Sequence, residues 1–181
     1  MALVKPFIIQ VAGYQNSGKT AAISRMIKEW SHRGKKVVTI KHHGHGGKPE
    51  VADEKDSSRH ILSGAAASLV EGEGRLVIHA EKNTWSLSDK IKLMKEFYPD
   101  IIVIEGHKQA EFPKVVMIKD QKDLKLLSSL VNIIAIVYWD EDVLMGSGLA
   151  AKYPRFSIQD GILEKQLIDL LQEVHKNDTK R

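Results

Sequence analysis

Short aliphatic runs and helix-like repeats alternate along most of this 181-residue chain. Consecutive aliphatic residues are typical of strands buried on both faces of a parallel sheet, whereas an apolar residue at every third or fourth position is typical of an amphipathic helix. The aliphatic runs cover residues 7–12, 37–40, 101–104, 115–118 and 131–137, and the helical repeats cover residues 23–30, 87–97, 124–130 and 162–174. The pattern predicts one α/β domain over residues 1–174, three layers thick, with a mostly parallel sheet, helices on both faces, and a frayed polar tail at residues 175–181.

The segment between residues 56 and 80 interrupts this alternation. Asp56 and Ser57 are placed to cap a short helix that ends at Gly64. Residues 65–70 and 76–80 then predict two strands, joined through Glu71-Gly72-Glu73-Gly74 into a hairpin. Ser86 or Ser88 is expected to cap the helix that follows, whose buried face is predicted to consist of Leu87, Ile91, Met94 and Phe97.

The segment from Gly13 to Thr20, Gly-Tyr-Gln-Asn-Ser-Gly-Lys-Thr, fits the phosphate-binding pattern G-x-x-x-x-G-K-[ST]. A predicted strand precedes it and a predicted helix follows it, which is the context that such a loop requires. Gly13 and Gly18 let the backbone turn tightly, so that N–H groups and the helix N-terminus face phosphate oxygens. Lys19 is expected to reach the β- and γ-phosphates and Thr20 to ligate Mg²⁺. The strand and helix disfavour the alternative of an ordinary glycine-rich turn, and the predicted fold is therefore of the P-loop NTPase type.

Glu105 follows the aliphatic run of residues 101–104 and is the second candidate site residue. Ligands of open α/β sheets bind beyond the carboxyl ends of the strands, so Glu105 and Gly106 are expected beside the glycine loop. A carboxylate there could hold Mg²⁺ or orient a nucleophilic water, although most P-loop proteins use aspartate at this position. A carboxylate that merely ends a strand is the alternative. Lys108 could contact phosphate or lie free in solvent.

The segment Lys41-His42-His43-Gly44-His45 follows the second predicted strand. Three histidines invite a zinc interpretation, but His42 and His43 are adjacent and point apart in an extended chain, and no carboxylate completes the set. An anion-facing loop in which Lys41 and a histidine contact phosphate or an oxygen-rich substrate is favoured, and solvated loop histidines remain the alternative.

The acidic segment of residues 53–60 has two interpretations. Asp53 or Asp56 could hold Mg²⁺ through water while Arg59 meets a phosphate. A helix cap with a surface ion pair explains the same residues equally well.

The recognition of a purine is weakly indicated. The element N-K-x-D that reads guanine in many GTPases is absent. The corresponding region, Tyr138-Trp139 followed by Asp140, Glu141 and Asp142, offers rings for stacking and carboxylates that could accept hydrogen bonds from guanine.

The composition narrows the class of protein. Hydrophobic residues make up 43% of the chain and charged residues 28%, which is the balance of a soluble globular protein. A net charge of +4 suits phosphate-bearing ligands, but dispersed lysines and only 6% aromatic residues do not indicate nucleic-acid binding. The absence of cysteine excludes disulfides and thiolate metal sites. With no signal peptide and no apolar run near the ~20 residues of a membrane span, a cytoplasmic protein is expected.

Four motifs together resemble the molybdopterin-guanine dinucleotide biosynthesis protein B (MobB) family. They are the loop G-Y-Q-N-S-G-K-T, the K-H-H-G-H run, D-S-S-R-H before Gly64, and E-G-H-K at residues 105–108. The resemblance covers roughly residues 1–110. It implies a SIMIBI-type P-loop fold, a homodimer, GTP binding with weak hydrolysis, and an accessory role in attaching GMP to molybdopterin. The implied partner is the molybdenum cofactor guanylyltransferase, with molybdopterin itself as a further ligand.

The motifs and the resemblance together suggest which residues form the site. Lys19 and Glu105 are expected to act in catalysis, and Thr20 and Glu105 to hold Mg²⁺. The residues expected to bind nucleotide are Gly13, Asn16, Ser17, Gly18, Lys19, Thr20, Ala21, Gly106, Lys41 and His42.

Two other functions fit a phosphate-binding loop. A small-molecule kinase normally closes an arginine-bearing lid over the phosphates, but the arginines beyond the first helix and its end, at positions 59, 75, 155 and 181, form no arginine-rich segment. A binding module that holds nucleotide without hydrolysing it is the third possibility. The accessory GTPase is favoured.

Overall fold

The computed structural model describes residues 5–42 and 56–178. Its backbone divides into two compact units, Met1–His42 with Lys90–Arg181, and His43–Asp89. The first unit contains the glycine loop and is an α/β structure, and the second contains the hairpin. Among the described residues, no helix is long and apolar enough to cross a membrane.

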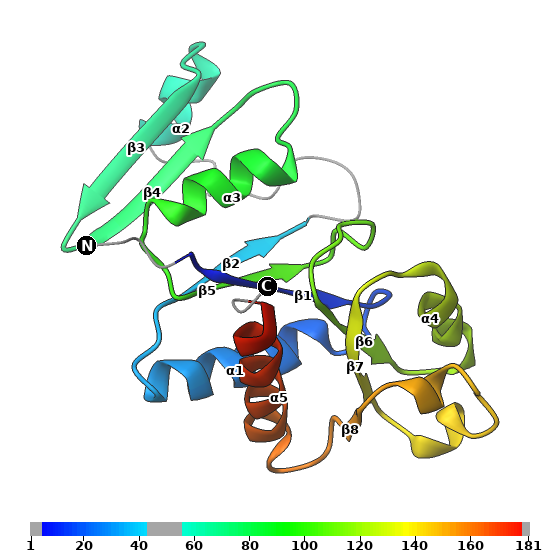
Figure 1. Cartoon of the computed structure of the whole chain (residues 1–181). Helices are drawn as coiled ribbons and strands as arrows, with labels where there is room; N and C mark the ends of the chain where they lie inside the picture. Colours follow the sequence, from blue (N-terminus) through cyan, green and yellow to red (C-terminus); the bar gives the residue numbers. More distant parts are fainter. Residues whose placement is uncertain (1–4, 43–55, 179–181) are drawn as a thin grey trace. The chain divides into compact units, whose positions relative to one another are not determined.

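A six-stranded parallel sheet forms the centre of the first unit (Figure 1). Its order is β2-β5-β1-β6-β7-β8. The strands are β1 (Phe7–Ala12), β2 (Val37–Lys41), β5 (Ile101–Glu105), β6 (Lys114–Ile118), β7 (Ile133–Tyr138) and β8 (Arg155–Ser157). The five aliphatic runs each form one of these strands, which confirms the mostly parallel sheet. The short β8 was not predicted.

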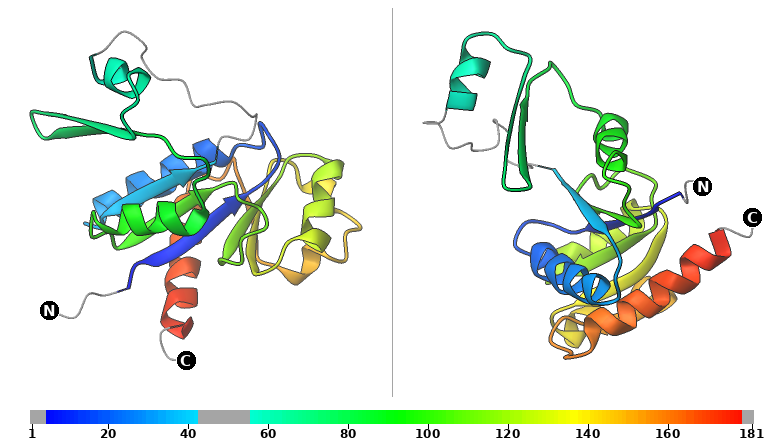
Figure 2. Two further views of the ribbon diagram at one scale, coloured as in Figure 1. Left: turned by 90° about the horizontal axis from the view of Figure 1, so that it is seen from above. Right: turned by 90° about the vertical axis from the view of Figure 1, so that its left-hand side faces the viewer.

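Helices α1 (Lys19–His32) and α5 (Leu163–Asp178) cover one face of this sheet, and both views in Figure 2 place them together. The apolar stripe of α1, with Met26 and Trp30 almost fully buried, packs with Leu167 and Leu171 of α5 against the strands. Helix α5 continues to Asp178, so the prediction of a frayed tail from residue 175 is wrong up to that point. The ring of His175 lies 4.8 Å from that of Phe7, centroid to centroid, which anchors the last turn.

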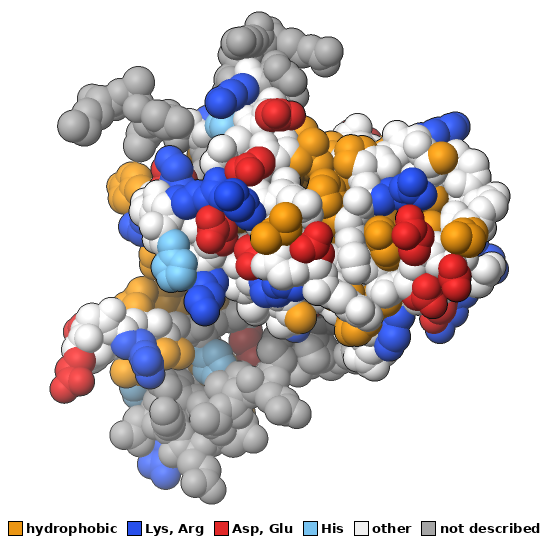
Figure 3. All heavy atoms as spheres, turned by 90° about the horizontal axis from the view of Figure 1, so that it is seen from below, with side chains coloured by type: hydrophobic (Ala, Val, Ile, Leu, Met, Phe, Trp, Pro, Cys, Tyr) orange, Lys and Arg blue, Asp and Glu red, His pale blue; other side chains and the backbone are white. Residues whose placement is uncertain are grey.

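The surface of these two helices carries both signs of charge. Arg25 pairs with Glu164 at 2.6 Å, and Arg33 pairs with Glu29 at 2.7 Å and with Asp169 at 3.1 Å. Figure 3 shows basic and acidic side chains interspersed on this face. The mild positive charge of the chain is therefore not concentrated here.

The opposite face of the sheet is covered by shorter elements. Helix α4 (Leu126–Ser129) and the 3-10 helices η1 (Gln121–Lys125), η2 (Glu141–Leu144) and η3 (Ala150–Lys152) enclose a second apolar core with β6 and β7. Helix α3 (Leu87–Lys95) buries Ile91. The prediction that Phe97 is buried is wrong: α3 ends at Lys95, Tyr98 takes a left-handed backbone with φ of 48°, and Phe97 is 38% exposed. Helices on both faces confirm the three-layer arrangement.

The second unit consists of α2 (Asp56–Leu62) and the antiparallel hairpin of β3 (Ala67–Gly72) and β4 (Arg75–Ala80), as predicted. The strands pair down to Gly72 and Arg75, leaving a two-residue turn in which Glu73 and Gly74 both have positive φ. This is the turn geometry that matches the twist of a hairpin. The hairpin keeps large apolar side chains in solvent, at Leu69, Val70, Leu76, Val77 and Ile78.

Candidate functional site

The carboxyl ends of the parallel strands place the predicted site segments at one edge of the sheet. The glycine loop follows β1, Glu105 ends β5, and Lys41 ends β2. Strands β2 and β1 both pair with β5, so Lys41, Val11 and Glu105 lie side by side in register. This is the edge at which open α/β sheets bind their ligands.

The glycine loop has a backbone that only glycine fits at two positions. A Cβ atom on Gly13 would lie 2.5 Å from Ser17 Oγ and 3.0 Å from Met117 Cβ. Gly18 has φ of +92°, and a Cβ there would lie 2.8 Å from Ile158 Cδ1. Asn16 also adopts a left-handed backbone, with φ of 57°. Such turns point successive N–H groups into one concavity, which is the geometry of an anion-binding loop.

Two side chains that directly follow β7 and β6 support this loop from outside. The indole Nε1 of Trp139 donates a hydrogen bond to the Ser17 carbonyl at 2.9 Å, and Lys119 Nζ donates to the Asn16 carbonyl at 3.4 Å. Ser17 is 1% exposed, and its Oγ is buried without a hydrogen-bond partner in the part of the chain that is described. A buried hydroxyl of this kind is rare and needs an acceptor or donor of its own. Its position inside the loop fits a ligand oxygen.

Lys19 begins α1 and folds back over the loop. Its Nζ donates a hydrogen bond to the Tyr14 carbonyl at 2.6 Å. Burial lowers the pKa of Lys19, and the neighbouring carboxylate of Glu105 opposes that shift. The lysine is thus held over the loop by one carbonyl, which a phosphate could replace.

Thr20 and Glu105, the two predicted magnesium ligands, are in direct contact. The Thr20 hydroxyl donates to Glu105 Oε1 at 3.0 Å, and Lys41 Nζ lies 3.6 Å from the same oxygen. Mg²⁺ is commonly held by one or two protein oxygens together with phosphates and waters, and a hydroxyl beside a carboxylate fits that requirement. Across the described ranges, no cluster of three or more His, Cys, Asp or Glu side chains could hold a metal by itself. Two of the three histidines of the zinc interpretation, His43 and His45, lie outside the described residues.

A buried glutamine fixes the backbone after Glu105. Gln10, fully buried in β1, donates from Nε2 to the carbonyls of Gly106 and His107. Gly106 has φ of +87°, and its N–H donates to the Val11 carbonyl at 3.1 Å. The two peptides that follow the carboxylate are therefore held next to the glycine loop. Nothing in the sequence predicted a role for Gln10, because its partners lie 96 and 97 positions away.

His42 packs beside His107. Their ring centroids are 4.6 Å apart, and Lys90 Nζ lies 3.1 Å from His107 Nε2. Burial, and after it the charges of Lys90 and His42, lower the pKa of His107 to about 4. His107 is therefore neutral near pH 7 and accepts a hydrogen bond from the Lys90 ammonium.

The remaining candidates are less closely grouped. Lys108 Nζ lies 4.0 Å from the centroid of the Tyr14 ring, so it is placed over the loop by a cation–π contact. Ala21 is exposed on α1, and Asp140 accepts from the Asp142 N–H and so caps η2. Tyr138 is partly buried against the second apolar core, whereas Trp139 is 38% exposed. Arg59 belongs to the second unit, and residues 53–55 lie outside the described part of the chain.

Comparisons with known proteins show the family of this chain. The model of the family described as "Molybdopterin guanine dinucleotide synthesis protein B" matches residues 8–139. A Bacillus subtilis protein named "Probable molybdopterin-guanine dinucleotide biosynthesis adapter protein" is 46% identical over 140 residues, which cover 76% of this chain and 80% of that protein.

Solved structures of two MobB proteins have a similar fold. The crystal structure of Bacillus subtilis MobB superposes with a TM-score of 0.75 at 34% identity, covering 90% of this chain and 96% of that one. A MobB homologue from Bacillus stearothermophilus gives 0.72 at 30% identity, covering 92% and 98%. The hydrogenase maturation factor HypB from Archaeoglobus fulgidus, with a TM-score of 0.51 at 14% identity and 92% and 88% coverage, shares the fold alone. A family match over residues 8–139, which include the glycine loop, Glu105 and Trp139, shows that this chain belongs to the molybdopterin guanine dinucleotide synthesis protein B family.

Proposed function

We propose that this protein binds GTP with Mg²⁺ at the glycine loop and acts, with weak hydrolysis, as an adapter in attaching GMP to molybdopterin. Its family works in the synthesis of the molybdenum cofactor, and the curated relatives carry the name of adapter proteins in molybdopterin-guanine dinucleotide biosynthesis. The observation that carries the proposal is the contact between the Thr20 hydroxyl and Glu105, 3.0 Å apart at the start of α1.

The residues of the loop suit a nucleoside triphosphate. Backbone N–H groups between Gly13 and Thr20 would receive the phosphates, and Lys19 would exchange the Tyr14 carbonyl for a phosphate oxygen. Thr20 and Glu105 would hold Mg²⁺, which, when bound, neutralises charge on the phosphates. Glu105 is well placed to do this because Thr20 and Lys41 already orient its Oε1.

Guanine is the base that the end of β7 suits best. Trp139 joins this segment to the loop through Ser17, so the residues after it lie close to a nucleotide bound there. Asp140 is occupied as the cap of η2, which leaves the exposed Glu141 and Asp142 to accept from guanine N1–H and N2–H. Adenine lacks these two donors.

Slow hydrolysis of GTP is expected from the types of cationic side chain near the glycine loop. An arginine that reaches the transferring phosphate contributes about 10³–10⁵ to the rate in related chemistry. In the described first unit, Arg25 bonds Glu164 and the Ile158 and Asp160 carbonyls, and Arg33 bonds Glu29 and Asp169. Arg155 begins β8, which is separated from β1 by strands β6 and β7. Among the described cations of the first unit, the lysines are therefore the ones available to the phosphates, which favours an adapter over a kinase.

The proposed partners follow from the role of the family in the synthesis of the molybdenum cofactor. The guanylyltransferase that joins GMP to molybdopterin is the protein partner, and molybdopterin is a candidate ligand beside the nucleotide. A homodimer is supported by the hairpin of the second unit, whose Leu69 and Val77 are 59% and 55% exposed. An isolated two-stranded ribbon is marginally stable in water, so such a surface requires a partner.

The test is to measure nucleotide binding by calorimetry for wild type, Lys19→Ala and the control Lys28→Ala, which changes an exposed lysine of the same helix. Loss of a charge-assisted phosphate contact costs about 1.5–3 kcal/mol, so Lys19→Ala should weaken GTP binding about 10- to 150-fold. Lys28→Ala should bind like wild type. Slow, GTP-specific phosphate release without an acceptor is expected. Rapid turnover that depends on an acceptor would instead identify a kinase, and binding of ATP but not GTP would overturn the proposal.

A further inference from the structure

A large cavity lies at the amino-terminal edge of the sheet, away from the glycine loop. It has a volume of about 820 Å³ and is lined from the starts of β1 and β5, the end of α3, the turn after α1 and the last turns of α5. Phe7 and Ile101 begin β1 and β5 and are paired in register, whereas the glycine loop follows the other end of β1. Six residues of strand span about 20 Å, so the cavity and the loop can be occupied at the same time.

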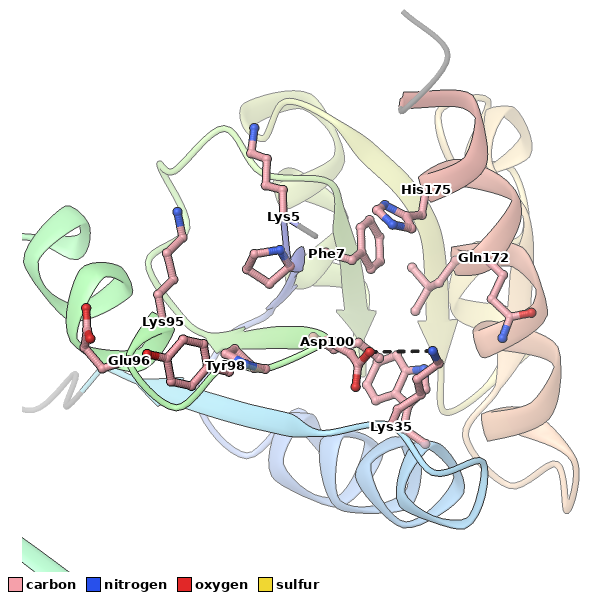
Figure 4. Close-up of a pocket in the computed structure, with 14 residues that line it drawn as sticks. Lys5, Phe7, Lys35, Lys95, Glu96, Tyr98, Asp100, Gln172 and His175 are labelled. Carbon is pink, nitrogen blue, oxygen red and sulfur yellow. Dashed lines mark ion pairs between the residues drawn. The ribbon is translucent and has the colours of Figure 1, made fainter. Parts of the chain in front are cut away.

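The floor of this cavity is apolar and aromatic. Trp30, Ile101 and Leu171 line it and are 2%, 7% and 1% exposed, so they form a fixed surface that belongs to the first apolar core. The rings of Phe7 and His175 meet at 4.8 Å with an angle of 47° between their planes. Figure 4 shows these two rings together on one side of the cavity, with the ring of Tyr98 across from them. Tyr98 is 68% exposed, and its backbone has a left-handed conformation.

The rim of the cavity is basic. Lys35 pairs with Asp100 at 3.6 Å, and Asp100 also accepts from the Lys36 N–H at 2.8 Å, so that carboxylate is satisfied. The ammonium groups of Lys5 and Lys95 make no ion pair or hydrogen bond with any residue that the structure describes, and Glu96 is the one other acid of the lining. In Figure 4 the side chains of Lys5 and Lys95 extend in the same direction from different elements. Two unpaired ammonium groups therefore flank an aromatic floor.

We propose that this cavity is a second ligand site, which binds a small aromatic anion. Its volume lies within the ~300–1,000 Å³ of typical small-molecule sites, and most such sites combine an apolar floor with a few polar groups that orient the ligand. A planar ring would stack among Phe7, Tyr98 and His175, because offset or tilted aromatic contacts are favourable. A phosphate, carboxylate or sulfonate on the ring would lie between Lys5 and Lys95. The site is separate from the nucleotide loop, and the inference does not depend on the proposed function.

The probe for this site is 8-anilinonaphthalene-1-sulfonate, with N-phenyl-1-naphthylamine as the matched compound that lacks the sulfonate. Fluorescence titrations compare wild type with Lys5→Gln/Lys95→Gln and with the control Lys28→Gln/Lys165→Gln, which changes two exposed lysines of α1 and α5. The site variant should weaken binding of the sulfonate at least tenfold and leave binding of the neutral compound within twofold. The control variant should match wild type for both compounds.

A second variant tests the aromatic floor without disturbing the backbone. Tyr98→Asn keeps a residue that tolerates the left-handed conformation and removes the ring, and it should weaken both compounds about threefold or more. Amide chemical shifts should change on titration at Phe7 and Ile101. Binding that is unaffected by the lysine pair, or shift changes confined to the hairpin residues Leu69–Ile78, would overturn the proposal.

Competition with GMP in the Lys19→Ala background then identifies the source of the anion. Displacement of the sulfonate in a lysine-dependent manner supports a nucleotide at this second site. Lysine-dependent sulfonate binding that GMP leaves unchanged supports an aromatic anion other than a nucleotide.

Discussion

Lys114 is a fully buried lysine whose charge is satisfied by backbone alone. Its Nζ donates to the carbonyls of Ala110, Phe112 and Val131, at 2.8, 3.1 and 2.6 Å. Burial lowers the pKa of Lys114, but three acceptors compensate the ammonium. These bonds tie the connection between β5 and β6 to the start of β7, so the residue holds the strand beside the glycine loop in place.

Replacement of Lys114 should therefore be costly. Lys114→Met leaves three carbonyls without their donor, and we expect a loss of about 2–3 kcal/mol in the free energy of unfolding, measured by urea denaturation. The matched control is Lys122→Met, which removes an exposed lysine that pairs with Asp120 at 3.0 Å. Exposed ion pairs contribute little to stability, so the control should unfold at the same urea concentration as wild type. Equal losses for the two variants would contradict the structural role of Lys114.

The carboxylate of Asp89 is hydrogen-bonded at the start of helix α3. Its carboxylate accepts from the Ser86 N–H at 3.0 Å and pairs with Lys82 at 2.8 Å, and its own N–H donates to Ser86 Oγ at 3.0 Å. This confirms that Ser86 caps the helix. The hydrogen bond from Lys82 and then those from Ser86 lower the pKa of Asp89 to about 2.

The sign of the resulting pH dependence follows from that lowered pKa. The unfolded chain takes up the proton near pH 3.9 and the folded chain near pH 2, so this stabilisation is complete above pH 4 and is lost as the pH falls toward 2. In a carboxyl-carbon NMR titration, Lys82→Met should raise the pKa of Asp89 part of the way to its ordinary value, because the Ser86 bonds remain. Lys92→Met, which changes an exposed lysine on α3, should not. High salt should act like Lys82→Met.

At the scale of elements, the junction of loop and helix limits what residue 18 can be. Gly18 and Gly34 both have positive φ, of +92° and +71°, but a Cβ on Gly18 meets Ile158 and Trp139, whereas one on Gly34 meets nothing within 4 Å. Gly34→Ala thus adds backbone strain alone, about 1 kcal/mol. Gly18→Ala adds the clash, and we expect a loss of about 2–4 kcal/mol in urea denaturation with GTP binding abolished. Similar stability and binding of the two variants would show that the loop can move away from Ile158.

The elements that sequence periodicity could predict are those buried on both faces. The run Ile101–Ile104 has no polar residue to place in solvent, so a central strand was predicted. The repeat of Ile23, Met26 and Trp30 puts three apolar side chains on one face of α1, and that face was predicted to be buried. Strand β8 has three residues and no such signal. The end of α3 was misplaced because Tyr98 adopts a left-handed backbone that no local motif indicates.

The site residues also divide into those that a local motif predicts and those whose partners lie far away in the sequence. Gly13, Lys19 and Thr20 were predictable because one local motif encodes their chemistry. The sequence offered Trp139 as a ring for stacking, but the bond from its N–H to Ser17, 122 positions earlier, was not predictable. Single polar residues in a strand, such as Gln10 and Lys114, carry no sign of the carbonyls they will meet.

At the scale of the whole molecule, the hairpin is the part whose surface requires explanation. Leu69 pairs directly with Ile78, so both side chains emerge from one face, where they are 59% and 41% exposed, and Val70 and Val77 emerge from the other. Along the residues that the structure describes, neither edge of this two-stranded sheet pairs with another strand. Unpaired edges and exposed apolar faces favour association, and a second copy of the chain offers the same surface in return.

The proposed homodimer should therefore depend on this hairpin. We expect sedimentation equilibrium to give twice the chain mass for wild type and the single chain mass for Leu69→Lys/Ile78→Lys, because four lysines would meet across a two-fold interface. Leu93→Lys, which changes a 42% exposed leucine of α3 outside the hairpin, should remain dimeric. GTP binding by the double variant separates assembly from the site: retained affinity means that each glycine loop is complete within one chain, and lost affinity means that the partner copy completes it. A monomeric wild type, or a double variant that remains dimeric, would place the interface elsewhere.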